Sequence, residues 1–256
     1  MGVLLNLYYD VLNIVSIMMN GIWCIWCYQV QSYQRSTYIY DEDKQLKLDF
    51  YPTTLTHSRP KPLILYAHGG GWVGGSRKNI PPAILAQLAR GYIVASISYS
   101  LMPKYKYPTP INDIVGACKW IQARHDELGI DPHRIIGWGL SAGAQIINYA
   151  AIQKGLFAGV ISWYGFSDLA IEDSNYFHRI TRLLIQNYSD GSKPLITNRI
   201  NSETCSFYIV HGAKDRFVPV DQSERLYKAL TKTKVPSRLK VYPNYYHGDW
   251  RLEIGD

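Results

Sequence analysis

Six short, continuous apolar runs alternate with helical stretches along most of this sequence. A parallel sheet that is buried on both faces requires strands of this kind, and the intervening helices supply the crossovers that parallel strands need. We therefore expect an α/β fold with a mostly parallel, doubly wound sheet and helices on both faces. The predicted strands cover residues 63–67, 92–97, 134–138, 159–163, 206–210 and 237–242, and the predicted helices cover 81–90, 111–127, 142–153 and 221–231.

Residues 45–51 follow a different pattern. The apolar residues Leu46, Leu48 and Phe50 alternate with polar ones, and the segment stops at Pro52. Strict alternation is typical of a strand that has one face in solvent. The pattern predicts an antiparallel strand at an edge of the sheet.

The composition is that of a globular protein. Hydrophobic residues make up 47% of the 256 residues and charged residues 18%, against about 25% charged residues in an average domain, which excludes intrinsic disorder. The net charge is +7, but the basic residues are scattered except for a run over residues 228–240. Such a run is usually a solvated surface, with a phosphate-binding or membrane-facing patch as the alternative. We expect no nucleic-acid partner.

Residues 1–35 stand apart because Asp10 and Arg35 are their only charged residues. The uncharged stretch 11–34 is long enough to cross about 30 Å of hydrocarbon as a helix. A helix that packs on the following domain is the alternative, and a secretory signal is less favoured because the segment has no basic start and no small-residue cleavage site. The aromatic residues near its end, which are Trp23, Trp26, Tyr28 and Tyr33, slightly favour membrane association; the localisation is otherwise left open. We divide the chain into this segment, 1–35, and one domain, 36–256.

The four cysteines match no zinc-ligand spacing, so we expect no metal site. Cys24 and Cys27 form a Cys-x-x-Cys motif, which is redox-active in some proteins. Here the motif lies in an apolar run without a neighbouring charge to activate a thiol. A redox role is therefore not favoured.

A Gly-x-Ser-x-Gly motif lies between the predicted strand 134–138 and the predicted helix 142–153. It reads Gly139-Leu140-Ser141-Ala142-Gly143. In a strand–turn–helix context this motif forms a sharp elbow that presents the serine as a nucleophile. We expect Ser141 to be that nucleophile and the backbone N–H of Ala142 to bind an oxyanion.

A glycine-rich turn follows the predicted strand 63–67 and reads His68-Gly69-Gly70-Gly71-Trp72. Consecutive glycines allow neighbouring N–H groups to point at one anion. Gly70 and Gly71 are therefore expected to complete the oxyanion hole, with His68 supporting the turn.

Two more strand ends carry an acid and a base. Asp215 follows strand 206–210 and His247 follows strand 237–242, so the chain order is Ser, Asp, His. This order is that of the α/β-hydrolase triad. Asp168 is a weaker candidate for the acid, and His211 is interpreted as a packing group at the end of a strand.

Together these motifs resemble those of α/β-hydrolase-fold esterases, close to the hormone-sensitive-lipase-like and feruloyl-esterase-like branches. The resemblance covers about residues 38–250 and includes shorter matches at 46–52, 99–108, 113–120 and 131–135. Ser100 departs from it, because an arginine is common at that position. Residues 169–201 match nothing in the family pattern and are a candidate cap insertion, and the closing helix after His247 is expected to be truncated.

The resemblance implies a serine hydrolase that cleaves a small-molecule carboxylic ester through an acyl-enzyme, without a metal or organic cofactor. A kynurenine-formamidase-like amide hydrolase is an alternative, since those enzymes share a His-Gly-Gly-x-Trp signature. A peptidase and a non-catalytic binding protein on the same fold also stay open. The acyl and alcohol specificity and the oligomeric state are left open by the sequence.

Overall fold

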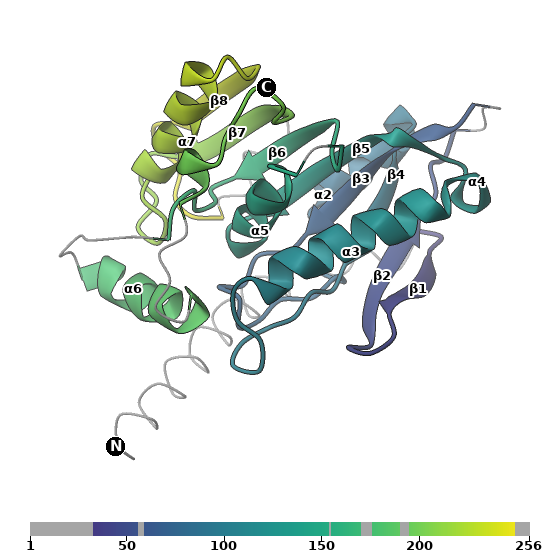
Figure 1. Cartoon of the computed structure of the whole chain (residues 1–256), viewed down its shortest axis with the longest axis horizontal. Helices are drawn as coiled ribbons and strands as arrows, with labels where there is room; N and C mark the ends of the chain where they lie inside the picture. Colours follow the sequence, from purple (N-terminus) through teal and green to yellow (C-terminus); the bar gives the residue numbers. More distant parts are fainter. Residues whose placement is uncertain (1–32, 56–58, 154, 170–175, 190–194, 249–256) are drawn as a thin grey trace.

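The computed structural model describes residues 33–55, 59–153, 155–169, 176–189 and 195–248. These residues form one sheet of eight strands in the order β1-β2-β4-β3-β5-β6-β7-β8 (Figure 1). Six consecutive strands of the sheet are parallel, namely β4, β3, β5, β6, β7 and β8. Strand β2 runs antiparallel to both of its neighbours, β1 and β4. The strands are β1 (Ser36–Asp41), β2 (Leu46–Tyr51), β3 (Lys61–Ala67), β4 (Ile93–Ile97), β5 (Ile130–Leu140), β6 (Gly159–Trp163), β7 (Ser206–Gly212) and β8 (Ser237–Tyr242).

Both faces of the sheet are covered, as the continuous apolar runs predict. On β3, Leu63 and Leu65 belong to one hydrophobic cluster, while Ile64 and Tyr66 between them belong to the cluster on the opposite face. Successive side chains of a strand point to opposite faces, so each face needs its own helical layer. Helices α3 (Thr109–Ala123), α5 (Ala142–Ala150) and α7 (Asp221–Lys232) cover the first face, and α2 (Pro82–Leu85) with the 3-10 helix η2 (Ala86–Arg90) covers the second. The mostly parallel, doubly wound α/β sheet is confirmed.

The prediction that residues 45–51 form an edge strand is wrong. Strand β2 lies between β1 and β4, and β1 is the edge. Because β2 has a neighbour on each side and is covered on both faces, Leu48, Asp49 and Tyr51 are fully buried. The alternation of apolar and polar residues is misleading because one of the polar residues, Asp49, is buried and forms an ion pair with Arg77 at 3.0 Å.

The segment 169–201 contains helix α6 (Tyr176–Ser189) and the short η3 (Ile196–Asn198). Figure 1 shows α6 outside the two helical layers of the sheet. Its last turns approach the glycine turn after β3, since the ring of Tyr188 stacks on that of Trp72 with centroids 4.4 Å apart. The end of α6 therefore lies beside the predicted oxyanion loop.

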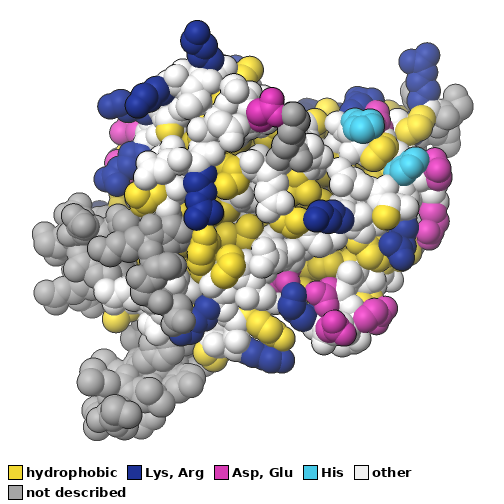
Figure 2. All heavy atoms as spheres, in the orientation of Figure 1, with side chains coloured by type: hydrophobic (Ala, Val, Ile, Leu, Met, Phe, Trp, Pro, Cys, Tyr) yellow, Lys and Arg dark blue, Asp and Glu magenta, His cyan; other side chains and the backbone are white. Residues whose placement is uncertain are grey.

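The anchor or packed helix predicted within residues 1–35 lies outside the described residues up to residue 32, and so do Cys24 and Cys27. In the part of the chain that the structure describes, no helix is both long and apolar enough to cross a membrane. On the face shown in Figure 2, the Lys and Arg side chains are spread over its whole width rather than gathered over one element.

Asp113 on α3 contacts both the backbone of Ser100 and the side chain of Lys44. Its fully buried carboxylate accepts a hydrogen bond from the Ser100 N–H at 2.8 Å and from the Lys44 Nζ at 2.7 Å. Lys44 comes from the turn between β1 and β2. The buried carboxylate is thus paired with a positive charge from another element.

We expect Lys44→Met to lower the free energy of unfolding by about 3 kcal/mol, because it leaves the buried carboxylate of Asp113 without its charge partner. Adding Asp113→Asn should recover part of the loss, since the uncompensated charge is then gone. Lys47→Met on β2 is the control, because Lys47 forms no ion pair with a described residue. Urea unfolding of the four proteins measures the effect, and equal losses for Lys44→Met and Lys47→Met would contradict this account.

Candidate active site

The turn between β5 and α5 holds Ser141 in an unusual backbone conformation. Ser141 has φ 53° and ψ −119°, and α5 begins at the next residue. A positive φ is costly for a residue with a side chain, so the surroundings must enforce it. The N–H of Ser141 donates to the Trp163 carbonyl at 2.9 Å, and the Ser141 carbonyl accepts from the N–H of Gln145 at 3.1 Å. These bonds tie the turn to β6 and to the first turn of α5.

Two glycines allow this turn to close. A Cβ atom at Gly143 would collide with the carbonyl oxygens of Ala67 and His68, and one at Gly139 would collide with the main chain of Gly143 and Ala144. The start of α5 therefore packs directly on the end of β3. This contact brings the serine turn next to the glycine turn that follows β3.

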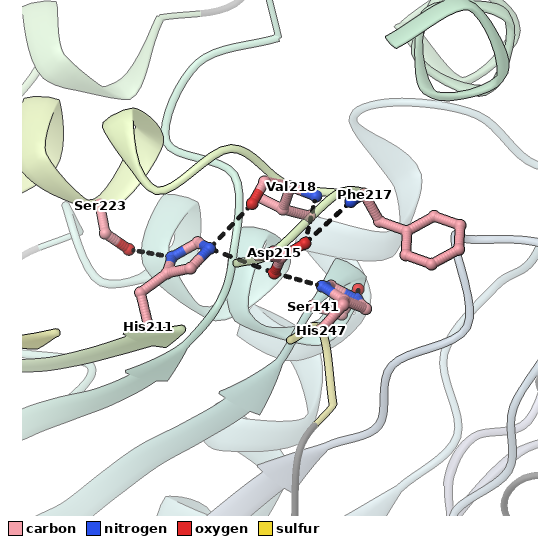
Figure 3. A network of polar contacts seen from close by, with 7 residues as sticks. All are labelled: Ser141, His211, Asp215, Phe217, Val218, Ser223 and His247. Carbon is pink, nitrogen blue, oxygen red and sulfur yellow. Dashed lines mark hydrogen bonds and ion pairs between the residues drawn. The ribbon is translucent and has the colours of Figure 1, made fainter. Parts of the chain in front are cut away.

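The structure brings the three predicted triad residues together (Figure 3). The Nε2 atom of His247 lies 2.9 Å from the Ser141 Oγ, and its Nδ1 lies 2.6 Å from the Asp215 Oδ2. The three residues come from the ends of β5, β7 and β8, whose carboxyl ends meet at one edge of the sheet. Ser141 and the His247 side chain are mostly buried, with 7% and 11% of their surface exposed.

The carboxylate of Asp215 is fully buried, and hydrogen-bond donors of the protein surround it. Its Oδ1 accepts from the N–H groups of Phe217 and Val218, each at 2.8 Å. Its Oδ2 faces His247 and, at 3.2 Å, the Nε2 of His211. Burial would raise the pKa of Asp215, but the charge of His247 and the hydrogen bonds from both histidines hold that pKa below its ordinary value. Asp215 therefore stays ionised over the whole neutral range.

The glycine turn presents its backbone toward the serine. Gly70 and Gly71 have φ values of 127° and 59°, which favour glycine. A Cβ atom at Gly69 would come within 3.3 Å of the Ser141 Cβ, so the two turns are in contact. Among the described residues, no backbone hydrogen bond uses the N–H of Gly70, Gly71 or Ala142. These are the three N–H groups that the sequence predicts to form the oxyanion hole.

Trp72 anchors the glycine turn, and sequence reasoning did not assign it this role. Its indole N–H donates to the Gln145 Oε1 at 2.9 Å, and its ring lies against Tyr188 and Phe166. Trp72 is 1% exposed. A hydrogen bond therefore joins the turn to α5, and a ring stack joins it to α6. The position of Gln145, four residues after Ser141, is the sequence feature that could have indicated the contact with Trp72.

His68 supports the same turn from the other side, as expected. Its ring stacks on Tyr99 at 4.4 Å, and the Tyr99 hydroxyl donates to its carbonyl at 2.7 Å. Burial lowers the pKa of His68 to about 4. The ring is therefore neutral near pH 7.

Asp168 and His211, the two other residues considered from the sequence, have different surroundings. The carboxylate of Asp168 accepts a hydrogen bond from the Thr197 hydroxyl at 3.1 Å, whereas His247 is bonded to Asp215. His211, interpreted from the sequence as a packing group, instead contacts Asp215. The spacing of four residues between His211 and Asp215 is the sequence feature that could have indicated this contact.

Two aromatic rings lie beside His247. The ring centroids of Tyr164 and Phe217 are 4.8 and 5.6 Å from that of His247.

Comparisons with known proteins agree with this fold. The model of the BD-FAE family matches residues 48–230. Esterase LipC of Mycobacterium tuberculosis is 25% identical over an alignment of 229 residues, and the match covers 78% of this chain and 57% of LipC. Esterase LipQ of the same organism is 26% identical over an alignment of 200 residues, and the match covers 69% of this chain and 47% of LipQ. The chain thus spans about half the length of these curated relatives.

Among solved structures, the chain is similar to Thermogutta terrifontis esterase 2 phosphonylated by sarin. The TM-score is 0.75 with 19% identity, and the match covers 86% of this chain and 87% of the other. At this identity the likeness concerns the fold, which is that of the α/β hydrolases.

We expect Gly143→Ala to destabilise the protein by about 3 kcal/mol or more, because the added methyl group must push the start of α5 away from β3. Gly116→Ala on α3 is a matched control, since a Cβ atom there meets nothing within 4 Å and alanine favours a helix by up to about 1 kcal/mol. Chemical denaturation measures both. A Gly143→Ala protein as stable as the Gly116→Ala protein would contradict the close contact.

The buried His68 also predicts a pH dependence of stability. The unfolded chain takes up a proton near pH 6.5 and the folded chain only near pH 4, so stability falls as the pH drops through this window, by about 1.4 kcal/mol per pH unit. His68→Gln should remove this part of the slope, and His125→Gln, at an exposed histidine, should leave it unchanged. Denaturant unfolding between pH 4 and pH 7.5 provides the measurement. Equal slopes in all three proteins would disprove the assignment.

Proposed function

We propose that this chain, which belongs to the BD-FAE family, is a serine hydrolase that cleaves carboxylic esters. The model of that family matches residues 48–230. The observation that carries the proposal is the line of hydrogen bonds from Ser141 through His247 to the ionised Asp215, beside three backbone N–H groups that have no backbone partner among the described residues. A nucleophile, a base, an orienting acid and an anion site are the parts that acyl transfer needs.

In the first half of the reaction, the Ser141 hydroxyl attacks the ester carbonyl while the His247 Nε2 takes its proton. The carbonyl oxygen becomes an oxyanion, and the N–H groups of Gly70, Gly71 and Ala142 stabilise it. His247 then gives the proton to the leaving alcohol oxygen as the carbon–oxygen bond breaks. The product is an acyl ester on Ser141.

In the second half, His247 takes a proton from water, which attacks the acyl-enzyme through a second oxyanion. The bond to the Ser141 Oγ breaks, the proton returns to that oxygen, and the carboxylic acid leaves. Throughout, the Asp215 Oδ2 accepts the Nδ1–H of His247, so the other ring nitrogen faces the serine and the imidazolium is stabilised.

One neighbour suggests where the alcohol part of the substrate lies. Since His247 hands its proton to the leaving oxygen, that part must be on the histidine side of the site. The Phe217 ring is 48% exposed and lies 5.6 Å from the His247 ring, on the side away from His211 (Figure 3). This placement favours esters with an apolar alcohol part.

We expect Ser141→Ala to lower kcat by about 10⁴-fold on nitrophenyl esters, because the nucleophile is lost while the oxyanion site remains. Ser206→Ala, at an exposed serine on β7, is the control and should keep full activity. An organophosphate should label the wild-type protein at Ser141, as peptide mapping by mass spectrometry can determine.

The substrate panel decides between the candidate activities. Nitrophenyl esters of graded acyl length and formylkynurenine are compared by kcat/KM in the wild-type and Ser141→Ala proteins. A preference for formylkynurenine makes the chain a formamidase. No Ser141-dependent turnover of any substrate, together with no organophosphate label, would favour a binding protein on this fold.

A further inference from the structure

His211 has no part in the reaction as proposed, yet it is completely buried against the proposed acid. It lies on β7, four residues before Asp215, and 0% of its side chain is exposed. Both of its ring nitrogens have partners (Figure 3). Its Nδ1 lies 2.7 Å from the Ser223 Oγ on α7, and its Nε2 lies 2.9 Å from the Val218 carbonyl and 3.2 Å from the Asp215 Oδ2.

These partners determine which ring nitrogen carries the hydrogen. A carbonyl oxygen and an ionised carboxylate only accept, so the Nε2 of His211 must be a donor. In the neutral ring the Nδ1 then accepts the hydroxyl hydrogen of Ser223. Ser223, itself 2% exposed, therefore holds the ring in the tautomer that donates toward Asp215.

The Nε2–H of His211 contacts the same carboxylate oxygen of Asp215 that binds His247. The Asp215 Oδ1 is occupied by two backbone N–H groups, and the Oδ2 is shared between His247 and His211. The same Nε2–H of His211 also contacts the carbonyl of Val218, whose N–H binds the other carboxylate oxygen. His211 thus connects both the carboxylate and the turn 215–218 to the end of β7.

We propose that His211 is a positioning residue for the triad and that Ser223 sets its tautomer, so that the Asp215 Oδ2 stays aimed at the Nδ1 of His247. This inference rests on the proposed function. His211 lies on the far side of Asp215 from Ser141 (Figure 3), and its side chain is completely buried. Its loss should therefore change the rate of the chemical step and not the binding of substrate.

Two substitutions separate positioning from packing. In His211→Asn the side-chain amide extends only about as far as the Nδ1, so the contact with Ser223 is retained and the donor toward Asp215 is lost. In His211→Gln the amide extends about as far as the Nε2, and its NH₂ group can donate to the Oδ2. Both remove the ring. His211→Met, which has about the volume of Gln but no donor, measures the effect of packing alone and should lose as much kcat as His211→Asn.

We expect His211→Asn to lower kcat by about 10- to 100-fold with KM unchanged within twofold, and His211→Gln to recover most of the loss. Ser223→Ala, which keeps the ring, should lower kcat by a smaller factor of about threefold. A second readout needs no turnover. The NMR resonance of the proton on the His247 Nδ1 moves downfield as its bond to Asp215 strengthens, and we expect this resonance to move upfield or disappear in His211→Asn and to return in His211→Gln.

The inference is overturned if folded His211→Asn and Ser223→Ala proteins keep the wild-type kcat and the wild-type resonance, or if Asn and Gln at position 211 lower kcat equally. If His211→Asn does not fold, Ser223→Ala decides by the same two readouts. A wild-type protein without Ser141-dependent turnover would overturn the proposed function alone, because the resonance still reports whether His211 positions Asp215.

Discussion

The direct contact between the start of α5 and the end of β3 is the constraint on which the site depends. At Gly143 the main chain of α5 lies against the carbonyl oxygens of Ala67 and His68, with no room for a side chain. Because of this contact, the turn that carries Ser141 and the turn that carries Gly70 and Gly71 share one location. The positive φ of Ser141 follows, since the chain must reverse from β5 into α5 within one residue.

The polar side of the site is built on a buried charge. A carboxylate without water is costly, and Asp215 is tolerated because two backbone N–H groups and two histidines surround it. Those bonds outweigh the effect of burial and keep its pKa low. In the proposed reaction, an ionised acid at this place orients His247 and stabilises its imidazolium.

The anion side of the site depends on aromatic packing. Trp72 has φ 63°, unusual for a bulky residue, and holds this conformation between Gln145 of α5 and Tyr188 of α6. Helix α6 belongs to the segment 169–201, predicted as a candidate cap insertion. Its contact with Trp72 connects α6 to the glycine turn that is proposed to form part of the oxyanion hole.

The doubly wound sheet, the serine elbow and the order of the proposed triad could be predicted from the sequence, because each rests on local patterns: continuous apolar runs, glycines at a tight turn and residues directly after strands. Four features are visible only in the folded chain: β2 lies inside the sheet, Lys44 pairs with Asp113, Trp72 stacks on Tyr188 of α6, and His211 contacts Asp215. The reason is physical. Strand neighbours, buried charge partners and ring stacks join residues far apart in the chain or across a turn, and their cost or gain depends on burial, which no short stretch of sequence specifies.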